Sequence, residues 1–127
     1  MQYEIEWGGD PEDLTVNTFG RATVEGLNGW VHEVLTDRRY RPGIGVLVDH
    51  RRLDWTSMTT HDLRRRAGLF LRDDDRIGPT RAALVAGRPV DYGLMRMVVA
   101  YLGGRAAFHA EVFYSLDEAR AWLRPDI

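Results

Sequence analysis

The sequence contains no cysteine, no lysine and no long hydrophobic run. Without cysteine the chain can form no disulfide, thiol nucleophile or thiolate metal site, which is typical of a cytosolic protein. All 17 basic residues are arginine, a bias that we interpret as GC-rich coding in a bacterium. The first residues include Glu4 and Glu6 instead of a basic leader with an apolar stretch, so we expect no signal peptide and no membrane span. Together these absences favour a cytoplasmic location.

Length and charge set limits on size and partners. The chain has 127 residues, of which 44% are apolar and 28% charged, so we expect one domain over residues 1–127 with its own core. The net charge is −2, and the 19 acidic residues are interspersed among the basic ones. This pattern argues against nucleic acid as a partner, because nucleic-acid-binding domains concentrate positive charge on one face.

Hydrophobic periodicity changes repeatedly between the spacing of strands and that of helices. Strands are predicted at 2–7, 14–20, 44–48, 81–86 and 106–114, and helices at about 24–36, 60–71, 89–102 and 116–123. Strands that alternate with helices predict an α/β fold with a mixed, largely parallel sheet. The first two strands follow each other through a glycine-rich turn, so we expect them to form an N-terminal antiparallel hairpin. About four helices complete the predicted domain.

The predicted helix at 60–71 begins with a capping signal and carries a run of arginines. Thr59 and Asp62 have the spacing of a capping box, as do Ser115 and Glu118 before the last helix. On helix 60–71 the apolar residues Leu63, Ala67, Phe70 and Leu71 share one face. We interpret the run 64–66 as lying mostly outside this face, and therefore as solvated charge.

Three segments resemble a known group of bacterial domains. They are Tyr40-x-Pro42-Gly43 before Val46-Leu47-Val48-Asp49, Pro89-x-x-Tyr92-Gly93-Leu94, and Val112-Phe113-x-Ser115-Leu116-x-Glu118-Ala119-x-Ala121-Trp122-Leu123. With the order of hairpin, helices and strands, they are similar to the SpoIIAA-like, STAS and SEC14-like families. The resemblance implies a non-enzymatic regulatory or protein-interaction module like the anti-sigma-factor antagonists. The similarity to SEC14-like proteins implies instead a carrier of a small apolar ligand or lipid.

Phosphorylation is the switch that the resemblance to the antagonists suggests. Those proteins carry a phosphorylatable serine in an Asp-Ser-Ser-Gly stretch that leads from a strand into a helix. The matching stretch here is Ser57-Met58-Thr59-Thr60, which lacks the glycine. Ser57 and Thr59 are the candidate phosphoacceptors, although capping of the following helix is the favoured explanation for Thr59.

The end of the predicted central strand is a candidate site because open α/β sheets bind ligands beyond the carboxyl ends of their strands. Asp49 and His50 lie there, followed by Arg51 and Arg52. A carboxylate and an imidazole could transfer a proton, which would make the chain a small enzyme. Adjacent strand residues point to opposite faces, however. We therefore expect no catalytic residues and keep Asp49 and His50 as interaction candidates.

Two apolar features are open to alternative interpretations. Trp55 is a large aromatic in a polar segment, so it either contacts a partner or folds back into the core. The residues 95–101 make the third predicted helix apolar on more than one side. This surplus would serve a homodimer, an apolar ligand pocket or deep burial.

No motif in the sequence indicates a metal or a cofactor. The histidines at 32, 50, 61 and 109 have no metal-binding spacing, and neither Gly-Gly pair opens a phosphate-binding helix. We therefore expect no metal site and no bound cofactor.

Overall fold

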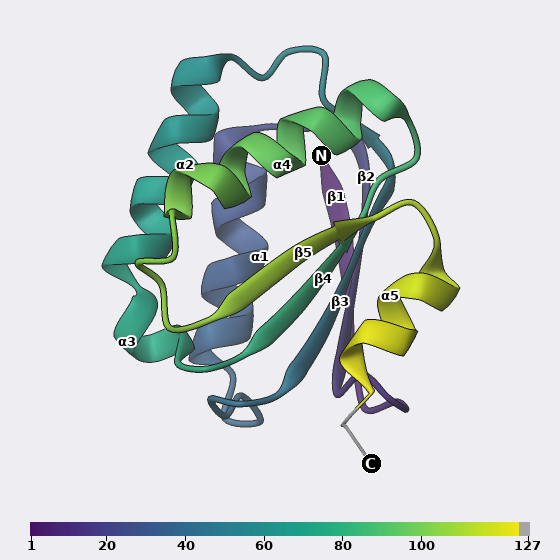
Figure 1. Cartoon of the computed structure of the whole chain (residues 1–127), viewed down its shortest axis with the longest axis vertical. Helices are drawn as coiled ribbons and strands as arrows, with labels where there is room; N and C mark the ends of the chain where they lie inside the picture. Colours follow the sequence, from purple (N-terminus) through teal and green to yellow (C-terminus); the bar gives the residue numbers. More distant parts are fainter. Residues whose placement is uncertain (125–127) are drawn as a thin grey trace.

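The computed structural model describes residues 1–124 and shows one sheet with helices on both faces (Figure 1). Along the chain the elements are β1 (Gln2–Trp7), β2 (Leu14–Arg21), α1 (Val24–Thr36), β3 (Gly45–Asp54), α2 (Thr60–Arg72), α3 (Asp74–Ile77), β4 (Arg81–Val85), α4 (Pro89–Leu102), β5 (His109–Phe113) and α5 (Leu116–Leu123).

The strands lie in the sheet in their chain order, β1-β2-β3-β4-β5. β1 and β2 form an antiparallel hairpin in which Ile5 is opposite Val16. The pairs β2–β3, β3–β4 and β4–β5 are all parallel. This arrangement confirms the predicted α/β fold with a mixed, largely parallel sheet and an N-terminal hairpin.

The helices are distributed unequally between the two faces. Connections between neighbouring parallel strands have one hand, so α1, α2 and α4 all lie on the same face, while α5 lies on the other (Figure 1). Alternate side chains of β3 therefore pack into different cores on the two faces of the sheet. Val46 and Val48 belong to the core on the α1 side, whereas Leu47 packs with Leu123 of α5.

Two of the predicted boundaries in this region are wrong. β3 does not end near Val48 but continues to Asp54, because β2 pairs with it along its whole length after a bulge between Asn17 and Phe19. The predicted last strand is shorter than expected: it begins at His109, where its pairing with β4 begins.

After α2 the chain also forms the short helix α3, which is not among the helices predicted from the sequence. Of the two predicted capping boxes, the one at Thr59 is complete, with Asp62 N donating to Thr59 Oγ1 at 3.1 Å and Thr59 N donating to Asp62 Oδ2 at 3.0 Å. At Ser115 the hydroxyl accepts from Glu118 N at 3.1 Å, which is the capping half of the motif.

None of the helices within residues 1–124 is both long and apolar enough to cross a membrane.

The docking of α5 can be tested by truncating its buried side chain. Leu123 is 5% exposed and packs on Leu47 and Val85, so Leu123→Ala should lower the free energy of unfolding by roughly 2 to 5 kcal/mol. Ser115→Ala removes a cap without leaving a cavity and should cost about 1 kcal/mol. Urea unfolding measures both, and a larger loss for Ser115→Ala than for Leu123→Ala would contradict this packing.

Candidate functional site

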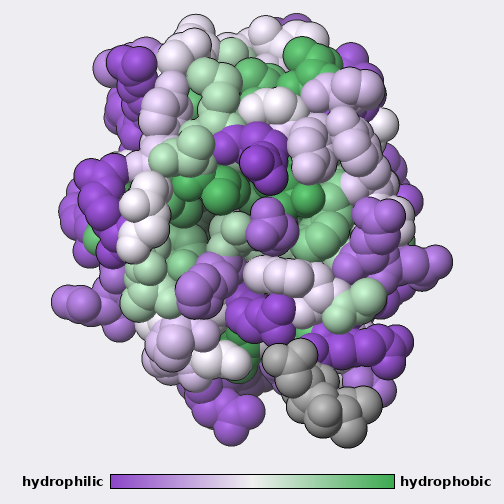
Figure 2. All heavy atoms as spheres, in the orientation of Figure 1, coloured by the Kyte–Doolittle hydropathy of each residue, from purple (hydrophilic) through white to green (hydrophobic). Residues whose placement is uncertain are grey.

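An apolar cavity of about 100 Å³ lies between the sheet and the helices α1, α2 and α4. Figure 2 shows apolar side chains gathered near the centre of this face of the molecule, where the surface is hollowed. The strands β3, β4 and β5 supply one wall, with small side chains at Ala82 and Ala110. The helices supply the opposite wall, including Trp30 from α1, Phe70 from α2 and Met95 from α4.

His50 faces this cavity from β3. It is 3% exposed, and its Nδ1 lies 2.6 Å from Thr18 Oγ1, while Thr18 Oγ1 donates to Asp49 O at 3.2 Å. Both hydrogen bonds form together when Nδ1 carries the proton, because the threonine hydroxyl has one hydrogen to give. Burial, reinforced by the charge of Arg66, lowers the pKa of His50 to about 3. The imidazole is therefore neutral at physiological pH.

Asp49 points to the other face of the sheet, as the alternation of strand residues predicts. Its carboxylate accepts from Arg51 Nε at 3.0 Å and from Arg51 Nη2 at 2.9 Å. Burial raises the pKa of Asp49, but the bonds from Arg51 outweigh it and hold that pKa below its usual value. The structure thus does not bring Asp49 and His50 together as a proton-transfer pair.

Trp55 lies in the core and not on a recognition surface. It is 3% exposed, so the interpretation in which it contacts a protein partner is wrong and the one in which it folds back under the loop holds. Its ring meets the His50 ring edge to face, with centroids 5.2 Å apart and an interplanar angle of 88°. Trp55 also lines the cavity, and its indole N–H is buried without an acceptor among residues 1–124.

Arg66 is the main residue that sequence reasoning missed. It is 5% exposed, so its assignment to a solvated run is wrong. The spacing could have revealed it, because position 66 lies three residues after Leu63 and four before Phe70, within the apolar stripe of α2. Burial lowers the pKa of Arg66 to about 9, which still leaves the guanidinium charged at neutral pH.

The surroundings of Arg66 are aromatic. Its guanidinium carbon lies 4.7 Å from the centre of the Phe70 ring and 5.8 Å from that of Trp30. Arg66 Nη1 donates to Asn28 Oδ1 at 3.3 Å. Within residues 1–124 none of the ion pairs includes Arg66, so no carboxylate of this part of the chain neutralises it.

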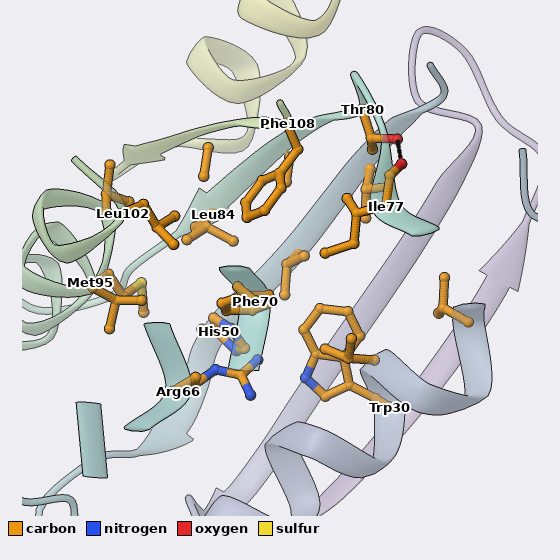
Figure 3. A pocket seen from close by; sticks show the side chains of 18 of the residues that line it. Trp30, His50, Arg66, Phe70, Ile77, Thr80, Leu84, Met95, Leu102 and Phe108 are labelled. Atoms are coloured by element: carbon orange, nitrogen blue, oxygen red, sulfur yellow. Dashed lines mark hydrogen bonds between the residues drawn. The ribbon is translucent and has the colours of Figure 1, made fainter. Parts of the chain in front are cut away.

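The lining of the cavity is mainly apolar, and Arg66, His50 and Trp30 bring nitrogen atoms to one end of it (Figure 3). In Figure 3 the nitrogen atoms of Arg66, His50 and Trp30 lie toward the same end, and Leu84, Leu102 and Phe108 lie away from them. The indole N–H of Trp30 is also buried without an acceptor in the described residues. Trp30 was not singled out from the sequence, although position 30 follows Leu27 at helical spacing.

Polar groups at another part of the wall are fully paired. Tyr40 donates its hydroxyl hydrogen to Ile77 O at 2.6 Å, and Thr80 Oγ1 lies 2.9 Å from both Tyr40 Oη and Ile77 O. Thr80 also accepts from Gly43 N at 3.2 Å. The buried donors without an acceptor in the described residues are the indole N–H groups of Trp30 and Trp55.

A second, polar cleft of about 200 Å³ adjoins the cavity between α1 and the α2–α3 region. The two hollows share part of their lining, namely Val31, Leu35, Arg66 and Phe70. The cleft also contains Arg72, Arg76 and His32 against a single acidic residue, Asp73. Arg66 thus lies where a polar, mainly basic cleft meets an apolar interior.

The candidate phosphoacceptors lie outside this cavity. Ser57 is exposed and its Oγ donates to Ala22 O at 3.2 Å. Thr59 is exposed as well, and its hydroxyl caps α2 beside the carboxylate of Asp62. A phosphate on Thr59 would meet that negative charge.

The apolar surplus of the third predicted helix, now α4, faces inward. Met95 and Val98 are 2% and 8% exposed and line the cavity together with Val99. Tyr101 is half-buried and accepts from Arg64 Nε at 3.3 Å. The surplus is therefore used in the core and the cavity wall, and self-association through α4 stays a prediction.

Among residues 1–124 no three His, Cys, Asp or Glu side chains are grouped closely enough to hold a metal ion.

The burial of neutral His50 predicts a specific pH dependence. The pKa is about 3 in the folded chain against 6.5 for a free histidine, so between these values the unfolded chain binds more protons and acid destabilises the fold. From pH 6.5 to about pH 4.5 the free energy of unfolding should fall by about 2 kcal/mol through this group. His50→Gln should lose that part of the dependence in urea unfolding, and the exposed control His109→Gln should keep it. Equal slopes for the two variants would contradict the buried neutral state.

Comparison with known proteins returns one informative likeness. No protein-family model matches the chain, and none of the curated proteins matches it. A crystal structure of an uncharacterized DUF3478-family protein from Shewanella loihica PV-4, described as having a SpoIIAA-like fold, superposes with a TM-score of 0.58 at 18% identity. The match covers 96% of this chain and 92% of that one. The chain therefore has the SpoIIAA-like fold that its segments predicted.

Proposed function

We propose that this chain is a non-enzymatic regulatory module that responds to a small apolar ligand bound in the cavity between the sheet and α1, α2 and α4. The cavity is the observation that carries the proposal. Protein interiors leave few hollows larger than a water molecule, and the apolar side chains around this one of about 100 Å³ lack packing partners on one side. A binding role accounts for apolar surface left unpacked.

The proposal joins two of the functions considered from the sequence. The carrier interpretation requires an apolar cavity, and Met95, Val98 and Val99 line one. The regulatory interpretation requires that binding alter a surface, and α2 offers a route. This helix contributes Arg66 and Phe70 to the cavity and begins next to the exposed Ser57 and Thr59.

Size restricts the ligand. An apolar cavity of about 150 Å³ binds benzene, so a cavity of about 100 Å³ accepts a short chain, and a single ring is its upper limit. A two-chain lipid exceeds this space by a wide margin. We therefore favour a small ligand over the lipid-carrier alternative.

Binding of a neutral apolar probe tests this function. Toluene should perturb the amide resonances of Leu84, Met95 and Val98 in a ¹H–¹⁵N NMR titration, because these residues line the cavity. Ala82→Leu, which adds three carbons to the cavity wall, should abolish those shifts and raise the free energy of unfolding by up to about 2 kcal/mol.

Ala100→Leu is the matched control, because Ala100 is an exposed residue of α4. It should bind toluene as the unmodified chain does. If toluene leaves the resonances of the cavity residues unchanged in the unmodified chain, the proposed function is wrong.

A further inference from the structure

We propose that the apolar cavity and the adjoining polar cleft form one site for a small apolar carboxylate, whose carboxylate binds Arg66 and whose apolar part fills the cavity. The inference rests on the proposed function, because it names the class of ligand for the same cavity. It also assigns Arg66 as the residue that determines specificity for an anion.

The first argument is the uncompensated charge of Arg66. An ionised group away from water is stable only when it is paired or well hydrogen bonded. Arg66 is 5% exposed, and the one hydrogen bond of its guanidinium within residues 1–124 is that to Asn28 Oδ1 at 3.3 Å. The faces of Phe70 and Trp30 offset part of the charge. Most of the guanidinium N–H groups are left for an acceptor, and a carboxylate matches their planar geometry.

The second argument is that Trp30, whose ring lies beside the Arg66 guanidinium, also has a donor without an acceptor in the described residues. The buried indole N–H groups of Trp30 and Trp55 are both unpaired in the described part of the chain. Natural proteins pair nearly all buried polar atoms, so both indoles are unusual, but neither nitrogen is exposed to the cavity, and an acceptor reaches them only if neighbouring side chains move. His50 adds a neutral imidazole beside Trp55. A carboxylate would accept from the guanidinium of Arg66, which also lines the cleft, whereas a hydrocarbon would accept from none of these donors.

The third argument is the way in which the two hollows meet. Arg66 is part of the lining of both. On the outer side the cleft presents Arg72, Arg76 and His32 with one acidic residue, Asp73, and this arrangement attracts anions. On the inner side the walls are apolar, with Leu84 and Val98 among them. A ligand with a charged head and an apolar body therefore fits in one orientation, with its charged head in the cleft and its apolar body in the cavity.

Volume sets the size of this ligand. The inner cavity of about 100 Å³ is smaller than the apolar cavity of about 150 Å³ that binds benzene, so a short alkyl chain fits it and a single ring is the upper limit. Benzoate is thus a suitable probe. Toluene has the same ring without the charge, and benzamide has nearly the same shape with a neutral amide.

Isothermal titration calorimetry with these three probes tests the inference. The unmodified chain should bind benzoate roughly tenfold or more tightly than benzamide, because a buried charge-assisted pair is lost with the amide. Arg66→Met keeps the length and apolar stem of the side chain and should remove this preference while toluene binding persists. Arg65→Met is the matched control, because Arg65 is exposed on the same helix, and it should leave the benzoate affinity unchanged.

The outcomes separate this inference from the proposed function. If toluene binds but benzoate binds no more tightly than benzamide, the carboxylate site is wrong and the apolar site stands. If neither toluene nor benzoate binds, both are wrong. Should Arg66→Met fail to fold, the benzoate-to-benzamide ratio of the unmodified chain decides alone. A benzoate affinity that Arg66→Met leaves intact would also overturn the assignment.

Discussion

All three crossover helices must share one face of the sheet, because β2, β3, β4 and β5 follow one another in order and their connections have one hand. The rest of the structure depends on this constraint. Three helices crowd over the α1 side, and α5 alone covers the other side with a compact cluster around Leu47 and Leu123. The cavity lies on the face that α1, α2 and α4 cover, where the strands present small residues such as Ala82 and Ala110.

The chemistry of the void depends on one residue of α2. Leu63, Arg66, Ala67 and Phe70 form one stripe of the helix, and the arginine takes a place at which an apolar side chain would fill space without an electrostatic penalty. The aromatic faces of Trp30 and Phe70 reduce that penalty. A protein selected only for stability would replace such a buried charge with a hydrophobic residue. The proposed carboxylate site is our explanation for its presence.

Much of the fold could be predicted from sequence, because it follows from local rules. Hydrophobic periodicity marked the strands and helices, and Thr59 marked the start of α2. The extension of β3 to Asp54 could not be predicted, since it depends on pairing with β2 after a bulge. Nor could the pocket, whose walls come from residues far apart in the chain. Of the candidate site residues, His50 and Trp55 came together at the cavity while Asp49, Ser57 and Thr59 did not, because a strand alternates its faces and the loop lies outside the core.

A crystal structure of the protein grown with benzoate would test the central claim most directly. The account predicts the benzoate carboxylate within hydrogen-bonding distance of the Arg66 guanidinium, with its ring among Leu84, Met95 and Val98, which line the cavity. Benzoate at the surface only, with ordered water or nothing beside Arg66 and the ring space empty, would contradict it.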